Sequence, residues 1–358
     1  MVEIPKTMKA VVKSENGYDN MSLKEIPVPE VTGNKVLLKV AYTGICGTDI
    51  HTFKGEYANA RYPLVLGHEF SGEVVKVGPD VKNLKPGDRV TSETTFETCG
   101  ECVYCKAKQY NLCDHRRGIG TVQNGAMANY VLTREESCHV LPDNVSYKLA
   151  AMSEPLAGCV HAMYQKTPVK FGDKILIIGP GPMGLLSLQI AKNIGATVIV
   201  SGVTKDENRL KIAKELGADY TVDTMKEDLK AVVDKLTDGV GLDKVYDCSG
   251  AVPAVNQAIS LLHKGGTLQQ VGLFAKPKNE LDLSTIIQHE ITYRGSRSQN
   301  PYDWPLAVFL ESKGVIDSDK MVTKVFDLDH WRDAFEAMMA GQELKVMIAS
   351  NPDDPDLK

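Results

Sequence analysis

A glycine-rich turn is the feature that most constrains how this chain can fold. It directly follows a short apolar segment at residues 174–178 and opens a helical pattern over residues 183–193. In such a strand–turn–helix unit the first glycine permits the tight turn, the second lets the backbone approach a pyrophosphate, and the third lets helix and strand pack closely. We therefore predict a dinucleotide site here rather than an ordinary tight turn. The turn residues expected to contact the cofactor are Gly179, Gly181, Pro182, Met183 and Gly184.

The pattern around this turn predicts a parallel sheet covered by helices. Apolar strand segments alternate with helical segments, and this alternation is typical of a doubly wound α/β sheet. The predicted strands are residues 174–178, 197–200, 243–247 and 267–271, and the predicted helices are residues 183–193 and 207–216. Because the length of 358 residues favours two domains, we expect a second domain in addition to this one.

The part of the chain before about residue 155 is β-rich. Short β-branched segments are bounded by glycine and proline turns, which predicts a sheet sandwich or partial barrel with long functional loops. The predicted strands are residues 35–42, 73–77 and 88–91. After about Gly295 the strand–helix alternation fades, and helical patterns at 303–313 and 329–340 precede a strand at 345–348. We expect this last stretch to rejoin the first domain.

Composition excludes several classes of protein. Hydrophobic residues make up 43% of the chain and charged residues 24%, and the net charge is -5. This balance is ordinary for a globular protein and gives no sign of a nucleic-acid or membrane-surface partner. The N-terminus lacks the apolar run of a secretory signal, and no apolar stretch is long enough to span a bilayer. We expect a cytoplasmic protein.

The acidic residue that usually ends the second strand of a dinucleotide-binding sheet is missing. An Asp or Glu there binds the ribose 2′-hydroxyl and repels a 2′-phosphate, but residues 198–204 contain neither. Asp206 is a substitute, although we favour it as the N-cap of the next helix. The sequence therefore predicts NAD or NADP as the cofactor. The other residues expected near it are Ser201, Thr204, Lys205, Arg209 and Val271.

Half of the 8 cysteines crowd one loop. They are Cys99, Cys102, Cys105 and Cys113. Four thiolates at this spacing can converge on one zinc ion and leave no open position, which predicts a structural site. The alternative is four free thiols that would oxidise easily. For Cys138, Cys159 and Cys248 we favour the role of small buried hydrophobes.

A second metal group is indicated by Cys46, His68 and Glu69. Thiolate, imidazole and carboxylate are all zinc ligands, and three protein ligands leave a fourth position open. Glu154 is a candidate for that position. Because His68 and Glu69 are adjacent, they can bind one metal only if the chain bends there. Spacing alone therefore leaves two alternatives open, that His68 is a core histidine and that Glu69 lies outside the coordination sphere. Asp49 is placed to orient the His68 ring.

Together these motifs resemble the zinc-dependent medium-chain dehydrogenases, over essentially the whole chain. The resemblance implies a GroES-like β-rich catalytic domain, residues 1–156 and 297–358, that holds both metal sites. It implies a Rossmann dinucleotide-binding domain at residues 157–296. The protein is then expected to transfer a hydride between an alcohol and NAD or NADP, and to form a homo-oligomer, a dimer or a tetramer.

The resemblance also implies roles for individual residues. Cys46, His68 and Glu69 would hold a catalytic metal, with Glu154 as fourth or outer ligand, and the four clustered cysteines would hold a structural zinc. Zinc is the expected catalytic metal, although the carboxylates would also suit manganese, cobalt or iron. The resemblance implies that Thr48 takes the alcohol proton and that His51 passes it to solvent.

Within the family, Glu69 and the segment 153–157 resemble the sorbitol and polyol branch. Longer strings resemble enzymes of D-arabitol phosphate, and they are residues 47–57, 154–165 and 295–304. The implied reaction is reversible oxidation of a secondary alcohol of a polyol, or of a polyol phosphate such as D-arabitol phosphate, to the ketose or ketose phosphate. The alternatives are a dehydrogenase of sorbitol or another free polyol, of threonine or of simple alcohols, and a catalytically silent metal-stabilised binding protein.

A phosphorylated substrate is also suggested by basic residues near the predicted catalytic segments. Arginine grips a phosphate through paired hydrogen bonds and lysine through a point charge. The alternative for each single residue is a solvated surface charge. The candidates are Lys54, Arg61, Arg117 and Arg297.

Overall fold

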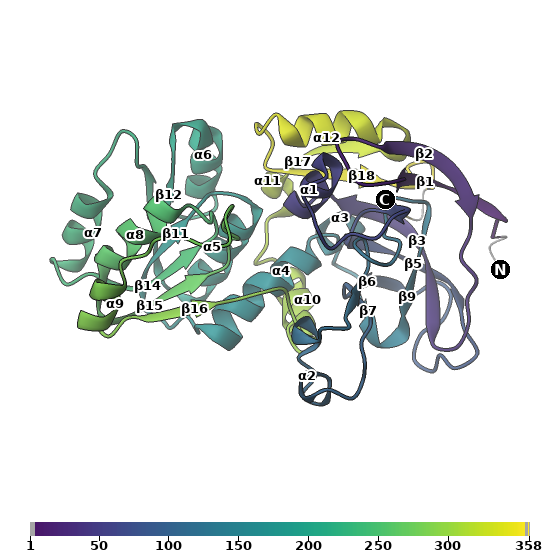
Figure 1. The fold of residues 1–358 in the computed structure, drawn as a ribbon, viewed down its shortest axis with the longest axis horizontal. Coiled ribbons are helices and arrows are strands. Elements are labelled where there is room, and N and C mark those ends of the chain that lie inside the picture. Colours follow the sequence, from purple (N-terminus) through teal and green to yellow (C-terminus); the bar gives the residue numbers. More distant parts are fainter. Residues whose placement is uncertain (1–3, 355–356, 358) are drawn as a thin grey trace. The chain divides into compact units, whose positions relative to one another are not determined.

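The computed structural model of the protein describes residues 4–354 and residue 357 (Figure 1). The internal contacts divide the chain into two compact units. The β-rich unit comprises the described residues of Met1–Glu154, Asn300–Gly314 and Val322–Lys358. The α/β unit comprises Pro155–Gln299 and Val315–Met321. The domain boundaries at 1–156 with 297–358 and at 157–296 stay a prediction.

The α/β unit contains a parallel sheet with the strand order β13-β12-β11-β14-β15-β16. The strands are β11 (Lys174–Ile178), β12 (Thr197–Gly202), β13 (Tyr220–Asp223), β14 (Leu242–Asp247), β15 (Leu262–Gln270) and β16 (Thr292–Gly295). The chain order reverses between β11 and β14, and open α/β sheets bind ligands at such a reversal. The predicted doubly wound sheet is confirmed.

Helices cover this sheet on both faces. The helices of this unit are α5 (Pro182–Ile194), α6 (Glu207–Glu215), α7 (Leu229–Thr237), α8 (Val252–Leu261), α9 (Leu283–Gln288) and the short α11 (Ser318–Met321). Leu176 of β11 belongs to one core with Val233 of α7 and Ile259 of α8. Ile175 and Ile177 are fully buried as well and point to the opposite face, where right-handed crossovers place α5 and α6. Burial on both faces explains why the strand segments are continuously apolar.

The glycine-rich turn joins β11 to α5 as the sequence indicated. Gly179 has a φ of 91°, which a residue with a side chain rarely adopts. A Cβ at Gly184 would overlap the carbonyl oxygen of Gly179, so the glycine lets the first turn of the helix approach the strand end. Gly181 is the N-cap of α5 and Pro182 takes the first helical position.

The β-rich unit is built from mostly antiparallel sheets, one of which the C-terminal stretch extends with the parallel pair β17 and β18. One sheet has the order β10-β6-β5-β3-β18-β17, with β9 also paired to β3; a second has the order β2-β1-β4, and β7 pairs with β8. The strands are β1 (Thr7–Lys13), β2 (Met21–Pro27), β3 (Lys35–Gly44), β4 (Leu64–Val65), β5 (Glu69–Val77), β6 (Arg89–Ser92), β7 (Thr95–Glu97), β8 (Arg117–Gly118), β9 (Tyr130–Arg134), β10 (Cys138–Val140), β17 (Val322–Asp327) and β18 (Lys345–Ala349). Met347 of β18 lies opposite Gly44 of β3.

Strand β3 is the centre of this unit. Leu38 and Val40 pack in one core with Phe70, whereas Leu37 packs in another core with Trp331 and other residues of the C-terminal stretch. β3 is therefore packed on both of its faces, which makes it a rigid base for the loop that follows it. The helices are α1 (Gly47–Lys54), α2 (Val103–Lys106), α3 (Tyr147–Ala150), α10 (Trp304–Ser312) and α12 (Trp331–Met339), and α4 (Ser153–Val160) carries the chain into the α/β unit. Across the described residues, no helix is long and apolar enough to cross a membrane.

Candidate active site

The side chains of Cys46, His68 and Glu69 converge in the β-rich unit. One ligand atom from each lies within 4.8 Å of the others. Cys46 is the N-cap of α1, just beyond the end of β3, and Glu69 opens β5. Directly before His68, Gly67 has a φ of 91°, and this bend lets the adjacent His68 and Glu69 side chains reach one place. The bend that two neighbouring ligands require is thus present.

Asp49 ties together the two segments that carry these side chains. Its carboxylate accepts the backbone N–H of Cys46 at 2.9 Å and that of Gly67 at 3.3 Å. The same carboxylate lies 3.7 Å from Nδ1 of His68, which is longer than a hydrogen bond. Asp49 therefore orients His68 through the backbone and through charge, not through the direct hydrogen bond of a usual histidine–carboxylate pair.

The group is buried and electrostatically coupled. Burial lowers the pKa of His68, but the negative charges of Asp49 and Cys46 raise it more, so that the pKa lies well above its ordinary value. The carboxylate of Glu154 raises the pKa of His68 as well. Glu154 itself is not part of the convergent group among the described residues, so its place as fourth or outer ligand stays a prediction.

Lys345 belongs to this site, and sequence reasoning missed it. Its ammonium group contacts Oε2 of Glu69 and donates to the carbonyl oxygen of Ile45 at 3.2 Å. Burial lowers the pKa of Lys345, but Glu69 and Cys46 raise it more, so the lysine stays charged. It lies 276 positions after Glu69 in the chain, and a lysine at the start of an apolar strand carries no local signal of such a role.

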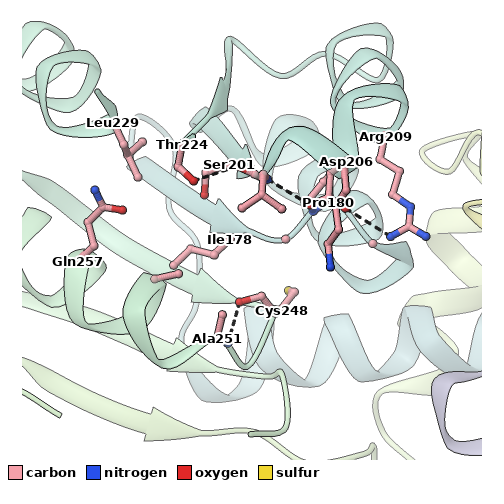
Figure 2. A pocket seen from close by; sticks show the side chains of 17 residues that line it. Ile178, Pro180, Ser201, Asp206, Arg209, Thr224, Leu229, Cys248, Ala251 and Gln257 are labelled. Carbon is pink, nitrogen blue, oxygen red and sulfur yellow. Dashed lines mark hydrogen bonds and ion pairs between the residues drawn. The ribbon is translucent and has the colours of Figure 1, made fainter. Parts of the chain in front are cut away.

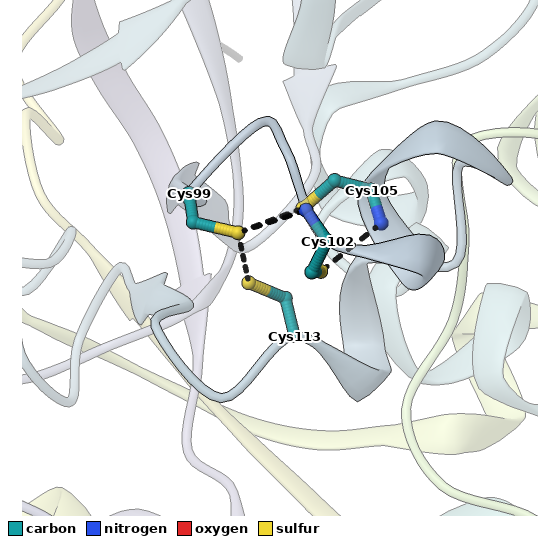
Figure 3. A group of neighbouring side chains, drawn as sticks. All are labelled: Cys99, Cys102, Cys105 and Cys113. Atoms are coloured by element: carbon teal, nitrogen blue, oxygen red, sulfur yellow. Dashed lines mark hydrogen bonds between the residues drawn. The ribbon is translucent and has the colours of Figure 1, made fainter.

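The four clustered cysteines form a second convergent group (Figure 3). The sulfur of Cys99 lies 3.8 Å from that of Cys105 and 3.7 Å from that of Cys113. The backbone N–H of Cys102 donates to the Cys99 sulfur at 3.4 Å, and the N–H of Cys105 donates to the Cys102 sulfur at 3.4 Å. Such bonds stabilise thiolates, and the first of them is the main cause that lowers the pKa of Cys99 to about 6. The arrangement suits a tetrahedral metal.

Thr48 and His51 lie on α1, which begins at the Cys46 cap. His51 is exposed in the last turn, and its Nδ1 lies 2.7 Å from Oε2 of Glu56. A carboxylate accepts a hydrogen bond, so Nδ1 is the donor in this pair. Gly55 ends the helix in the left-handed conformation and allows the chain to turn Glu56 back toward His51.

A cavity of about 340 Å³ lies in the α/β unit where the sheet order reverses (Figure 2). It contains five of the residues expected to contact a cofactor, and they are Gly179, Gly181, Ser201, Lys205 and Arg209. The lining also includes residues that the sequence did not assign to the cofactor, among them Thr224, Leu229, Cys248, Ser249 and Gln257. Thr224 follows β13, Cys248 and Ser249 follow β14, and Leu229 and Gln257 lie on α7 and α8. Only the fold brings these segments together, a feature that residue spacing does not reveal.

Other expected cofactor residues do not line this cavity. Pro182, Met183 and Gly184 form the first turn of α5. The hydroxyl of Thr204 donates to the Asp223 carboxylate at 2.9 Å, and the N–H of Val271 donates to the carbonyl of Asp247 at 2.9 Å. Contact of these residues with a cofactor stays a prediction.

Asp206 is the acidic residue that the cavity contains. It occupies the N-cap position of α6, but its carboxylate accepts the N–H of Val203 at 3.1 Å instead of capping that helix. Nη1 of Arg209 lies 3.7 Å from its other oxygen (Figure 2). A carboxylate and a guanidinium therefore stand side by side where a ribose would be recognised.

The basic candidates for a substrate phosphate lie on the surface. Lys54 ends α1, and the N–H of Arg61 donates to the carbonyl of Thr121. Arg117 is paired with Glu97 at 3.0 Å, and Arg297 belongs to the α/β unit. Their role in binding a phosphate stays a prediction.

Comparison with known proteins matches both units. Residues 32–143 match the family described as the alcohol dehydrogenase GroES-like domain. Residues 182–312 match the family described as zinc-binding dehydrogenase. The predicted combination of a GroES-like and a Rossmann domain is confirmed.

Relatives match over nearly the whole length. The chain is 64% identical over 349 residues to D-arabitol-phosphate dehydrogenase of Enterococcus avium, with 98% of this chain and 99% of that protein covered. It is 48% identical over 341 residues to sorbitol dehydrogenase of Halalkalibacterium halodurans, with 95% and 99% covered. A solved zinc-binding dehydrogenase of Sinorhizobium meliloti 1021, bound to NADP, superposes with a TM-score of 0.89 at 34% identity, covering 97% of this chain and all of that one. The resemblance that the motifs indicated is confirmed.

Proposed function

This chain belongs to the zinc-binding alcohol dehydrogenases, and on that premise we propose that its substrate is a polyol phosphate, with D-arabitol phosphate as the leading candidate. The reaction class is that of the family, NAD(P)-dependent oxidation of a secondary alcohol to a ketone and its reverse. The observation that supports this substrate is the 64% identity to the D-arabitol-phosphate dehydrogenase over 98% of this chain. Substrate identity drifts within a fold, which is why it is a proposal.

Cys46, His68 and Glu69 would hold the catalytic zinc. Their atoms lie within 4.8 Å of one another, and thiolate, imidazole and carboxylate suit this ion. A bound zinc supplies a Lewis acid that favours the alkoxide form of the alcohol. Glu154 would approach from outside the group, and the Cys99 cluster would hold the structural zinc.

The protein's own residues would move the alcohol proton. Thr48, two residues after Cys46, offers a hydroxyl that accepts it. His51, one turn further along α1, passes it to solvent through Nε2, since Glu56 holds the proton on Nδ1. Both residues lie on one short helix that Asp49 anchors at its N-terminus, so their spacing is fixed by the backbone.

The cavity in the α/β unit would hold the nicotinamide cofactor that accepts the hydride. Gly179 and Gly181 leave the backbone open to a pyrophosphate at the N-terminus of α5, where the helix dipole favours negative charge. Lys205 and Arg209 would face the ribose, which fits either NAD or NADP.

A substrate panel tests the proposal. We expect kcat/KM for D-arabitol 1-phosphate or D-arabitol 5-phosphate to exceed that for D-arabitol and sorbitol by at least about tenfold, because two charge-assisted hydrogen bonds are worth more than the roughly 1.4 kcal/mol of a decade. Arg61→Ala and Arg117→Ala then identify the phosphate contacts, since a true contact lowers turnover of the phosphate ester and leaves that of the free polyol unchanged.

The second candidate is a dehydrogenase of a free polyol. The observation that favours this second candidate is the 48% identity to sorbitol dehydrogenase over 95% of this chain. Equal or better turnover of D-arabitol or sorbitol than of the phosphates would establish this candidate. A cytoplasmic location and a dimer or tetramer remain predictions, and the oligomeric state is measured by light scattering.

A further inference from the structure

Three strands bring a lysine from the end of the chain onto the Glu69 carboxylate. β18 pairs with the end of β3, and Glu69 at the start of β5 lies opposite Gly44 of β3. The Lys345 and Glu69 side chains are each 2% exposed. Two fully buried charges in contact are stable only as a pair, because a single buried charge would lack compensation.

The backbone is shaped to admit this pair. Gly44 lies against both side chains, and a Cβ there would overlap Oε2 of Glu69 and the Lys345 chain. The second hydrogen bond of Lys345, to the carbonyl of Ile45, fixes the ammonium between the end of β3 and the Cys46 loop. The lysine is thus placed next to the proposed metal ligands and cannot reach solvent.

We infer that Lys345 is a positioning residue of the metal site, which holds Glu69 in place and competes with the bound metal for its negative charge. The inference rests on the proposed role of Cys46, His68 and Glu69 as ligands. A doubly charged cation and an ammonium group repel each other and attract the same carboxylate. The lysine therefore weakens metal binding, and Glu69 neutralises less of the metal's charge.

A purely structural role makes the opposite prediction. If Lys345 simply held β18 against β3, its loss would loosen the ligands and speed the loss of metal. If it competes for Glu69, removal of its charge tightens the metal. The sign of the change therefore separates the two roles, and it is a property of metal binding rather than of turnover.

The experiment follows zinc release from purified, zinc-loaded enzyme to a chromogenic chelator. Cys46→Ser and Cys102→Ser assign the two release phases, since each lacks one zinc. We expect Lys345→Met to slow release from the catalytic site by at least about tenfold. Lys345→Arg keeps the charge and should stay within about twofold of the original enzyme. The matched control is Lys324→Met, because Lys324 lies on the neighbouring strand β17 and pairs with Glu343 at the surface.

Lys345→Gln provides the test if Lys345→Met does not fold, since its amide is a neutral hydrogen-bond donor for the carboxylate and the carbonyl that Lys345 contacts. It too should release zinc more slowly. Unchanged or faster release in the neutral variants would overturn the inference and leave a structural lysine. If Cys46→Ser binds as much zinc as the original enzyme, the proposed metal site itself is wrong, so the two failures are distinguishable.

Discussion

The two candidate metal groups of the β-rich unit differ in how the chain assembles them. The four cysteines lie within residues 99–113 and converge through one loop and one short helix. The other group joins Cys46 after β3, His68 and Glu69 at the start of β5, and Lys345 at the start of β18. The first group is local in sequence, and its charged ligands are all thiolates. The second group forms only because β3, β5 and β18 pair in one sheet, and it includes the ammonium group of Lys345. A local cluster suits a closed, structural ion, and a cluster between strands leaves room for chemistry.

Loss of the catalytic group should have the largest effect. Cys46→Ser removes the thiolate ligand, and we expect kcat to fall by at least about 10³-fold, because a bound zinc supplies several kcal/mol of charge stabilisation. Cofactor binding, measured by fluorescence of the reduced nicotinamide, should persist because its cavity lies in the other unit. Cys138→Ser is the control, since Cys138 lies outside both groups. Full activity in verified zinc-free enzyme would contradict this prediction.

Loss of the local group should act on stability first. Cys102→Ser leaves three thiolates, and zinc sites in small domains supply roughly 10–16 kcal/mol of apparent binding free energy. We expect the melting temperature to fall by about 5 °C or more and the zinc content to fall by one ion per chain. Activity per folded molecule should change little. A variant that keeps its melting temperature and loses hydride transfer would reverse the assignment of the two groups.

The contrast between the groups also explains how much the sequence could predict. The cysteine loop and the glycine-rich turn are local, so their residue types and spacing predict both structure and chemistry. Cys46, His68 and Glu69 were identified because each is a ligand type, yet spacing alone could not show that they meet. Lys345 lacked both signals, since lysine is rarely a zinc ligand and its partner lies on another strand. The same holds for Ser249 and Gln257, which reach the proposed cofactor cavity only through the strand order.

A buried carboxylate that has no cationic partner among the described residues provides a sharper test of what Lys345 does for Glu69. Glu311 of α10 is buried, and its carboxyl oxygens lie 2.9 Å from the Ser153 hydroxyl. Burial raises the pKa of Glu311 from 4.5 to about 8, and the hydrogen bond from Ser153 offsets only part of this. The folded protein therefore keeps a proton that the unfolded chain releases near pH 4.5. This group's contribution to stability is full below that pH and is lost as pH rises toward about 8.

Glu311→Gln should abolish the loss of stability that Glu311 causes as pH rises, because the amide of glutamine mimics the protonated carboxyl group. Relative to the original protein, we expect the free energy of unfolding of the variant to rise by about 3–4 kcal/mol between pH 5 and pH 8, at up to about 1.4 kcal/mol per pH unit. Urea titrations at both pH values measure it. Glu30→Gln, at an exposed position, should show no such change. Parallel pH dependences of the variant and the original protein would mean that Glu311 is ionised when buried and has a cationic partner as Glu69 does.

The smallest expected effect concerns the cofactor cavity, where charge pairing again decides the outcome. The Asp206 carboxylate would repel the 2′-phosphate of NADP, but Arg209 stands 3.7 Å from it and offsets that charge. We expect Arg209→Ala to lower the ratio of kcat/KM for NADP to that for NAD by about tenfold, roughly 1.4 kcal/mol. Asp206→Asn should raise the same ratio, because the repulsion disappears while the guanidinium remains. Lys211→Ala is the matched control on α6, since Lys211 pairs with Glu207 at the surface. If neither cavity variant changes this ratio, residues 201–209 do not contact the cofactor ribose. If the original enzyme prefers NAD over NADP by more than about a thousandfold, roughly 4 kcal/mol, Asp206 binds the 2′-hydroxyl of NAD.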